Sequence, residues 1–257
     1  MKILEFQIQL LNKIFSDIFI CFSLLTRIPV RKTEFKKSNI GKSCWAFPIC
    51  GLVVGSISLI VFHVSIEVGF NKYIAAIFFV LINLFLTGAL HEDGLADLAD
   101  GMFVGKDVQS KLSIMSDSRI GVFGVLALMI SVNLKIFLIS ELSHELNTYL
   151  HLIFIFMLSR YFMLFFLRFL RPLKKNGLGK GFDISENRTL LIGMLPIIPL
   201  IFFLGYTVII IFFSMFIICL ILLLIIRYKF SGQTGDICGA SQQINEISGL
   251  LFLSVVL

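Results

Sequence analysis

Long runs of apolar residues recur along this chain and limit its possible folds more than any other feature. Several of these runs reach about 18 residues, the length that a helix needs to cross the ~30 Å hydrocarbon core of a bilayer. Of the 257 residues, 58% are hydrophobic. The composition therefore excludes a soluble domain and predicts an all-α, polytopic bundle embedded in a membrane.

The pattern predicts about six to seven transmembrane helices, preceded by an N-terminal amphipathic helix over residues 10–28. The predicted spans are 47–68, 73–90, 120–140, 149–167, 190–204, 206–226 and 247–257. The last is only eleven residues long, so it either spans poorly or needs support from its neighbours. The stretch before it, 227–246, is polar and is predicted to be a loop. Residues 1–257 are assigned to a single membrane-embedded catalytic domain.

The net charge of +6 raises the question of a nucleic-acid partner. Most of the 22 lysines and arginines, however, fall in four short loops between apolar spans, namely 31–46, 91–119, 168–189 and 227–246. The connections on the other side, 69–72 and 141–148, contain only Lys72. This asymmetry follows the positive-inside rule. We therefore predict no nucleic-acid partner, and we place the four loops on the cytoplasmic face of the membrane.

The segment 91–121 concentrates acidic residues in a chain that has few of them. Of the 16 acidic residues in the chain, six lie here: Glu92, Asp93, Asp97, Asp100, Asp107 and Asp117. If the segment is helical, Asp93, Asp97 and Asp100 share one face, because they are spaced i, i+4 and i+7. Like charges on one face repel one another, so a cation is expected to neutralise them. Hard oxygen ligands suit Mg²⁺ or Mn²⁺.

The alternative is a solvated loop, which is the more common meaning of a charged run beside an apolar segment. Two features favour a metal site. The segment lacks the mixture of Lys and Glu that is typical of a solvated face. It also contains small residues that let a ligand or a helix approach the backbone: Gly94, Ala96, Ala99 and Gly101. We predict Asp93, Asp97 and Asp100 as Mg²⁺ ligands, with Asp117 and Asp236 as additional ones.

Cations near this segment predict phosphate binding. Carboxylates that hold a divalent metal, with lysine or arginine on phosphate oxygens, are what phosphoryl transfer requires. Arg119, the arginine of the acidic segment, is the predicted phosphate-binding cation. Lys180, Arg168 and Arg171 are weaker candidates that could equally be membrane-surface anchors. The NGLGKGF run does not have the spacing of a P-loop. A carboxylate or His91 is the predicted general base, so the predicted catalytic set is Asp93, Asp97, Asp100, His91 and Arg119.

The order and spacing of several motifs resemble the adenosylcobinamide-GDP ribazoletransferases, or cobalamin synthases. The matching stretches are LLTRIP (24–29), FPICGLVVG (47–55), GALHEDGLADLADG (88–101), IMSDSRIGVFGVLAL (114–128), GLG (177–179) and GQTGDICGASQQINE (232–246). The resemblance implies a Mg²⁺-dependent membrane enzyme of cobalamin biosynthesis. In that reaction a hydroxyl of α-ribazole, or of its 5′-phosphate, attacks the cobinamide-linked phosphate of adenosylcobinamide-GDP, and GMP leaves.

Two alternatives remain open from the sequence. CDP-alcohol phosphotransferases carry a DGxxAR motif, but here Asp93-Gly94-Leu95-Ala96 is followed by Asp97, and the Ala-Arg pair is absent. A divalent-cation transporter would use the same acidic residues, although it would more often place them near the membrane midplane. The acceptor's phosphorylation state and a homo-oligomeric state are also left open.

Overall fold

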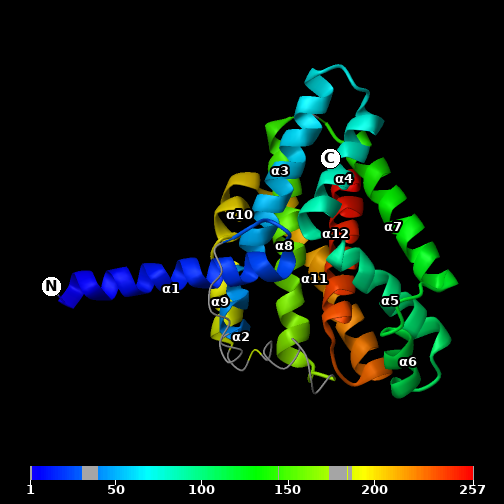
Figure 1. Cartoon of the computed structure of the whole chain (residues 1–257). Helices are drawn as coiled ribbons and strands as arrows, with labels where there is room; N and C mark the ends of the chain where they lie inside the picture. Colours follow the sequence, from blue (N-terminus) through cyan, green and yellow to red (C-terminus); the bar gives the residue numbers. More distant parts are fainter. Residues whose placement is uncertain (1, 31–39, 144, 174–183, 185–186, 257) are drawn as a thin grey trace.

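The structure is a computed structural model that describes residues 2–30, 40–143, 145–173, 184 and 187–256, and its regular elements there are helices (Figure 1). Five long helices run through the bundle: α3 (Phe47–Glu67), α7 (Val122–Glu141), α8 (Leu146–Phe169), α11 (Tyr206–Phe230) and α12 (Gly235–Val256). In the described part of the chain, a partly different set of five segments is long and apolar enough to cross a membrane: Glu5–Leu25, Ile40–Glu67, Val122–Glu141, Leu146–Phe169 and Tyr206–Phe230. The number is six if the bent pair Lys72–Thr87 and Leu90–Val104 counts as a single span. The predicted multi-pass, all-α bundle is confirmed.

Close packing of α3 on α8 forms the centre of the bundle. A Cβ atom at Gly51 would overlap the carbonyl of Phe156, and one at Gly55 would lie 3.1 Å from the Phe156 side chain. Small residues spaced four apart allow two helix backbones to approach in this way. The GxxxG pair in the first predicted span is therefore a helix contact, as its spacing indicates.

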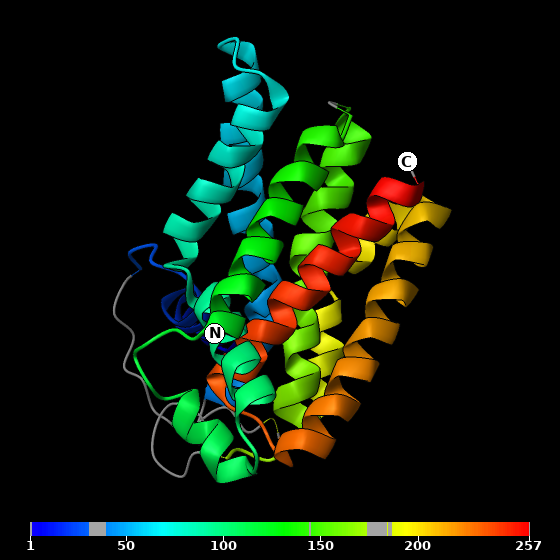
Figure 2. The same ribbon diagram turned by 90° about the vertical axis from the view of Figure 1, so that its right-hand side faces the viewer.

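A sharp bend separates α4 (Lys72–Thr87) from the acidic helix α5 (Leu90–Val104), and the two helices meet at 89°. Gly88 and Ala89 both take left-handed conformations there, with φ of 64° and 54°. Such a conformation is easy for glycine but costs an alanine of the order of 1 kcal/mol. The bend turns the acidic segment across the bundle, and α6 (Val108–Ile114) follows it at the same end of the molecule (Figures 1 and 2).

The N-terminal helix α1 (Lys2–Leu25) extends sideways from the bundle (Figure 1). The predicted amphipathic helix is present, but it begins before residue 10, and Glu5–Leu25 also passes as a membrane span by length and composition. Asp17 attaches it to α2 (Ile40–Ser43) and η2 (Cys44–Ala46): its carboxylate accepts hydrogen bonds from Ser43 Oγ at 2.6 Å and Trp45 Nε1 at 3.0 Å.

The span predicted over 190–204 is apolar and helical, but it is interrupted and too short to count among the candidate membrane spans. The structure has two short helices there, α9 (Arg188–Met194) and α10 (Ile198–Leu204), separated by a turn. Pro196 lies in this turn and Pro199 in the first turn of α10. Proline lacks an N–H group and clashes with the preceding helical turn, so it interrupts a helix that hydropathy alone would continue.

The predicted polar loop 227–246 is wrong. α11 continues to Phe230, and α12 begins at Gly235 and includes both the polar stretch and the eleven apolar residues after it. At 1.5 Å per residue, its 22 residues extend about 33 Å. The side chains of Gln242, Gln243 and Glu246 are fully buried in the bundle, where they have polar partners.

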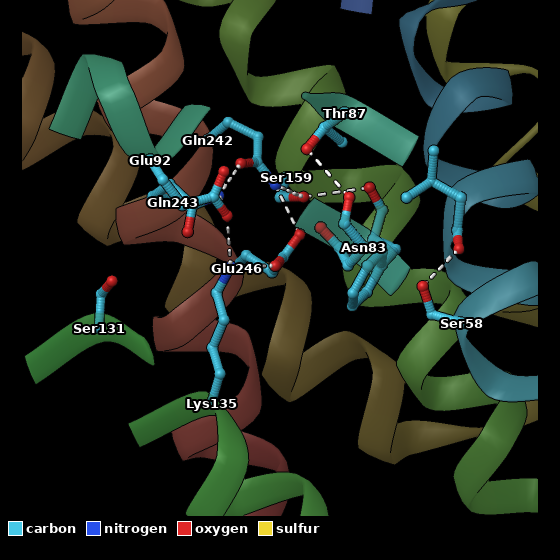
Figure 3. A network of polar contacts seen from close by, with 12 residues as sticks. Ser58, Asn83, Thr87, Glu92, Ser131, Lys135, Ser159, Gln242, Gln243 and Glu246 are labelled. Carbon is cyan, nitrogen blue, oxygen red and sulfur yellow. Dashed lines mark hydrogen bonds and ion pairs between the residues drawn. The ribbon is translucent and has the colours of Figure 1, made fainter. Parts of the chain in front are cut away.

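A cluster of four charged side chains lies inside the bundle, and Figure 3 shows three of them: Glu92, Lys135 and Glu246. Lys135 of α7 lies 2.8 Å from Glu246 and 3.5 Å from Glu92 of α5. Arg160 of α8 forms a second ion pair with Glu246. Gln243 donates a hydrogen bond to Glu92 at 2.9 Å. Two cations and two anions from four helices thus balance one another, which is how buried charges are tolerated.

We predict that Lys135→Met lowers the free energy of unfolding by about 3–5 kcal/mol, because it leaves an uncompensated buried carboxylate. Thermal unfolding of the detergent-purified protein measures this effect. Adding Glu92→Gln restores charge balance and is expected to recover part of the loss. Lys106→Met, at an exposed lysine, is the control, and equal midpoints for the Lys135 and Lys106 variants would contradict the prediction.

Candidate active site

The acidic helix α5 presents Asp93 and Asp97 on one face, which we call the acidic face. Asp93 is exposed and Asp97 is partly buried. The neighbouring Glu92 points the other way, into the buried charge cluster. Since successive helical residues are rotated by about 100°, fixing Glu92 inward turns Asp93 outward. The predicted helix and its i, i+4 spacing of carboxylates are therefore present.

The start of α12 packs directly against the acidic face. A Cβ atom at Gly94 would lie 2.5 Å from the carbonyl oxygen of Asp236, so the two backbones touch there. Thr234 precedes the helix, and its hydroxyl donates a hydrogen bond to the Asp236 carboxylate at 3.2 Å. Gly239, one turn further along α12, packs against the backbone of His91. The structure thus brings the segment 234–236 (Thr-Gly-Asp) beside the acidic residues. This agrees with the prediction that loops 91–119 and 227–246 lie on the same face.

Asp100, also predicted as a metal ligand, contacts the start of α7. Its two carboxylate oxygens accept hydrogen bonds from the backbone N–H groups of Gly121 at 2.7 Å and Gly124 at 2.9 Å. A carboxylate that accepts from the first N–H groups of a helix stabilises that helix end. Asp100 therefore connects α5 to the loop that carries Asp117 and Arg119, whereas its role as a ligand stays a prediction.

Asp117 and Arg119 form an exposed pair with each other. Arg119 donates to Asp117 through Nε at 3.1 Å and Nη2 at 2.8 Å. These hydrogen bonds lower the pKa of Asp117 to about 2, so the carboxylate is ionised at neutral pH. The predicted additional ligand and the predicted phosphate-binding arginine are thus paired in the loop just before Gly121.

Arg171 is brought to the start of α12 by backbone pairing. Its carbonyl accepts a hydrogen bond from Gln233 N at 2.8 Å, and Leu173 N donates to Gln233 O at 3.0 Å. This places Arg171 in the strand-like segment next to Thr234 and Asp236. Arg168, in the last turn of α8, donates a hydrogen bond from Nε to the side-chain oxygen of Asn187 at 2.9 Å. Lys180 and the NGLGKGF run lie outside the described residues.

His91, predicted as a general base, is buried between α5 and α12, with only 1% of its surface exposed. Neither ring nitrogen has a hydrogen-bond partner among the described residues. The ring is thus separated from solvent, unlike the exposed carboxylate of Asp93.

The comparison with known families identifies the chain's relatives. A family model for cobalamin-5-phosphate synthases matches residues 17–254. The chain belongs to this family. It is 34% identical to an adenosylcobinamide-GDP ribazoletransferase of Mesorhizobium japonicum over 254 residues, which covers 96% of this chain and 95% of that protein. Proteins with the same name from Clostridium tetani (34%, covering 94% of this chain and 97% of the relative) and Clostridium kluyveri (31%, 96% and 99%) are similar over comparable lengths. No solved structure matches the chain.

The donor groups at the acidic face suit a hard divalent cation. No group of three or more His, Cys, Asp or Glu side chains in the described residues forms a ready-made metal cage. Mg²⁺ does not require one, because it usually keeps several waters and binds through one or two carboxylates together with substrate phosphates. Asp93 and Asp97, with Asp236 adjoining them through Gly94, supply carboxylates of this kind at one end of the bundle.

Sequence reasoning missed the buried charge cluster. Arg160 lies within the predicted span 149–167, where an arginine is costly unless it is paired, and the structure supplies Glu246 as its partner. Lys135 gave the same signal, since a lysine inside an apolar span is costly unless it is paired. Together these two cations indicate that two carboxylates must enter the bundle.

We predict that Gly94→Ala separates α5 from α12, because the added Cβ meets backbone atoms that cannot move without shifting a helix. Overpacking of this kind costs about 1–3 kcal/mol, so the thermal unfolding midpoint should fall. Gly235→Ala is the matched control at the same junction, since a Cβ there has no atom within 4 Å. The contact has no energetic importance if both variants unfold at the wild-type temperature.

Proposed function

We propose that this chain is an adenosylcobinamide-GDP ribazoletransferase that acts in the last steps of cobalamin biosynthesis. It would join the adenosylcobinamide phosphate group to α-ribazole, or to α-ribazole 5′-phosphate, and release GMP. Membership of the family and the names of its relatives support this assignment. The structural observation that carries it is the acidic face beside Asp236, with Arg119 and Arg171 on the adjoining segments.

The reaction replaces one phosphorus–oxygen bond with another. The acceptor hydroxyl forms a bond to the cobinamide-linked phosphorus and gives up its proton to a base, while the bond from that phosphorus to the oxygen of the departing GMP breaks. We assign the base to a carboxylate of the acidic face, because the His91 ring is buried. A base must lie within hydrogen-bond reach of the proton that it removes, and an exposed carboxylate meets that condition.

Mg²⁺ would be held by Asp93 and Asp97, with Asp236, Asp100 and Asp117 as the further predicted ligands. The ion would supply positive charge to phosphate oxygens as negative charge develops on them. Arg119 and Arg171 would contact phosphate oxygens, and Arg168 is a more distant candidate. We place the protein in a bacterial inner membrane with its active site on the cytoplasmic face, where it would have access to nucleotide substrates. The distribution of lysine and arginine among the loops supports this orientation.

We predict GMP release by the detergent-purified protein when it is given adenosylcobinamide-GDP, α-ribazole and Mg²⁺. EDTA should abolish the release, and added Mg²⁺ should restore it. Chromatography of the corrinoid product distinguishes the two acceptors when α-ribazole and its 5′-phosphate are supplied separately. If the folded protein releases no GMP with either acceptor, the proposed function is wrong. CMP release from a CDP-alcohol, or metal uptake into vesicles, would then identify the alternative.

We predict that Asp97→Asn reduces GMP release by about a hundredfold or more, because it removes a charge that faces the metal and phosphates. Its unfolding midpoint should stay near that of the wild type, since the change conserves shape. Asp107→Asn is the matched control. Asp107 caps α6 by accepting from Ser110 N at 2.8 Å, and asparagine caps a helix equally well. Equal activities in the two variants would remove Asp97 from the metal site.

A further inference from the structure

Arg27 lies at the bend from which the acidic helix starts. Its backbone N–H donates a hydrogen bond of 2.7 Å to the carbonyl of Leu86, in the last turn of α4. Its side chain runs across Gly88, where a Cβ atom would overlap the guanidinium Nε. Figure 2 shows the segment after α1 beside the end of α4 where α5 begins. The main chain and the stem of the side chain are therefore both held at this bend.

The charge of Arg27 has no partner in the described chain. Its guanidinium makes no ion pair or hydrogen bond with any described residue, and Arg27 is exposed. Two other arginines near the site differ in this respect, because Arg119 is paired with Asp117 and Arg168 with Asn187. A guanidinium offers five N–H donors in a planar fork that matches phosphate oxygens.

The bend also fixes where this charge lies relative to the acidic face. Asp93 N donates to Ala89 O at 2.9 Å, so Asp93 is on the first turn of α5, immediately after the residues that Arg27 contacts. Arg119 and Arg171 adjoin the face from the starts of α7 and α12. Arg27 adds a cation from a third direction, at the N-terminal end of α5.

We propose that Arg27 binds phosphate oxygens of the diphosphate in the nucleotide-activated donor, and that Gly88 provides the space for its side chain. This inference rests on the proposed function for the identity of the donor. The diphosphate would lie across the start of α5, between the Arg27 guanidinium and the carboxylates that hold the cation. The acceptor has no diphosphate, so Arg27 contributes to binding of the donor and not of the acceptor.

The test compares Arg27→Gln and Arg27→Lys with a matched control, Lys106→Gln, at an exposed cation on the other end of α5. Two quantities are measured on the full-length protein in detergent. The first is the affinity for inorganic pyrophosphate in the presence of Mg²⁺, by isothermal titration calorimetry. The second is the KM for adenosylcobinamide-GDP and for α-ribazole in GMP release.

For Arg27→Gln we expect about a tenfold loss of pyrophosphate affinity and a similar rise in the donor KM, as for the loss of a charge-assisted hydrogen bond. The α-ribazole KM and the unfolding midpoint should not change, because the backbone bond to Leu86 needs no particular side chain. Arg27→Lys should recover part of the affinity, and Lys106→Gln should match the wild type.

Wild-type pyrophosphate affinity in Arg27→Gln would overturn the inference, and so would an equal rise in both KM values with a lowered unfolding midpoint. The two proposals fail separately. If the wild type releases no GMP, the proposed function is wrong, whereas the pyrophosphate titration still decides whether Arg27 is a phosphate-binding residue. If GMP is released with the same donor KM by the wild type and Arg27→Gln, only the inference about Arg27 fails.

Discussion

The ion pairs of Glu246 with Lys135 and Arg160 are the interaction on which the rest of the structure depends. They allow the polar half of α12 to enter an apolar bundle, because a carboxylate can be buried there only with cations beside it. Through Lys135 the same cluster includes Glu92 of the acidic helix. Fixing Glu92 inward sets the rotation of α5 about its axis. The exposure of Asp93, one residue later, is thus a consequence of charge pairing inside the bundle.

Small residues then determine how near the other segments come to α5. Gly94 lets the backbone at Asp236 reach the acidic face, and Gly121 and Gly124 let Asp100 bind the start of α7. In each case a Cβ atom would overlap the partner, so a larger residue would push the adjoining loop away. Gly94, Gly121 and Gly124 therefore act on the site through packing distances rather than through backbone flexibility.

The sequence allows the local features to be predicted, because hydropathy and i, i+4 spacing depend on residues close together in the chain. The long apolar helices and the shared face of Asp93 and Asp97 are of this kind. The helical state of 235–246 could not be predicted in this way, because a polar stretch is typical of a loop unless its buried partners are known. Those partners are distant in the sequence: Arg160 and Glu246 are 86 positions apart. Arg27 escaped notice for the same reason: nothing in LLTRIP indicates that its side chain crosses Gly88.

The charges of this protein fall into two groups that differ in how they are neutralised. Glu246, in the interior, has two cations within the chain, so that cluster is complete without a ligand and its role is structural. By contrast, Asp93 and Arg27 have no ion pair with any described residue, although Arg27 packs on Gly88 and Asp93 lies on the helical turn that follows this glycine. Opposite charges that are close but not paired are suited to a ligand that carries both signs. A divalent cation bound to a diphosphate is such a ligand, because its metal faces the carboxylates and its free oxygens face the arginine.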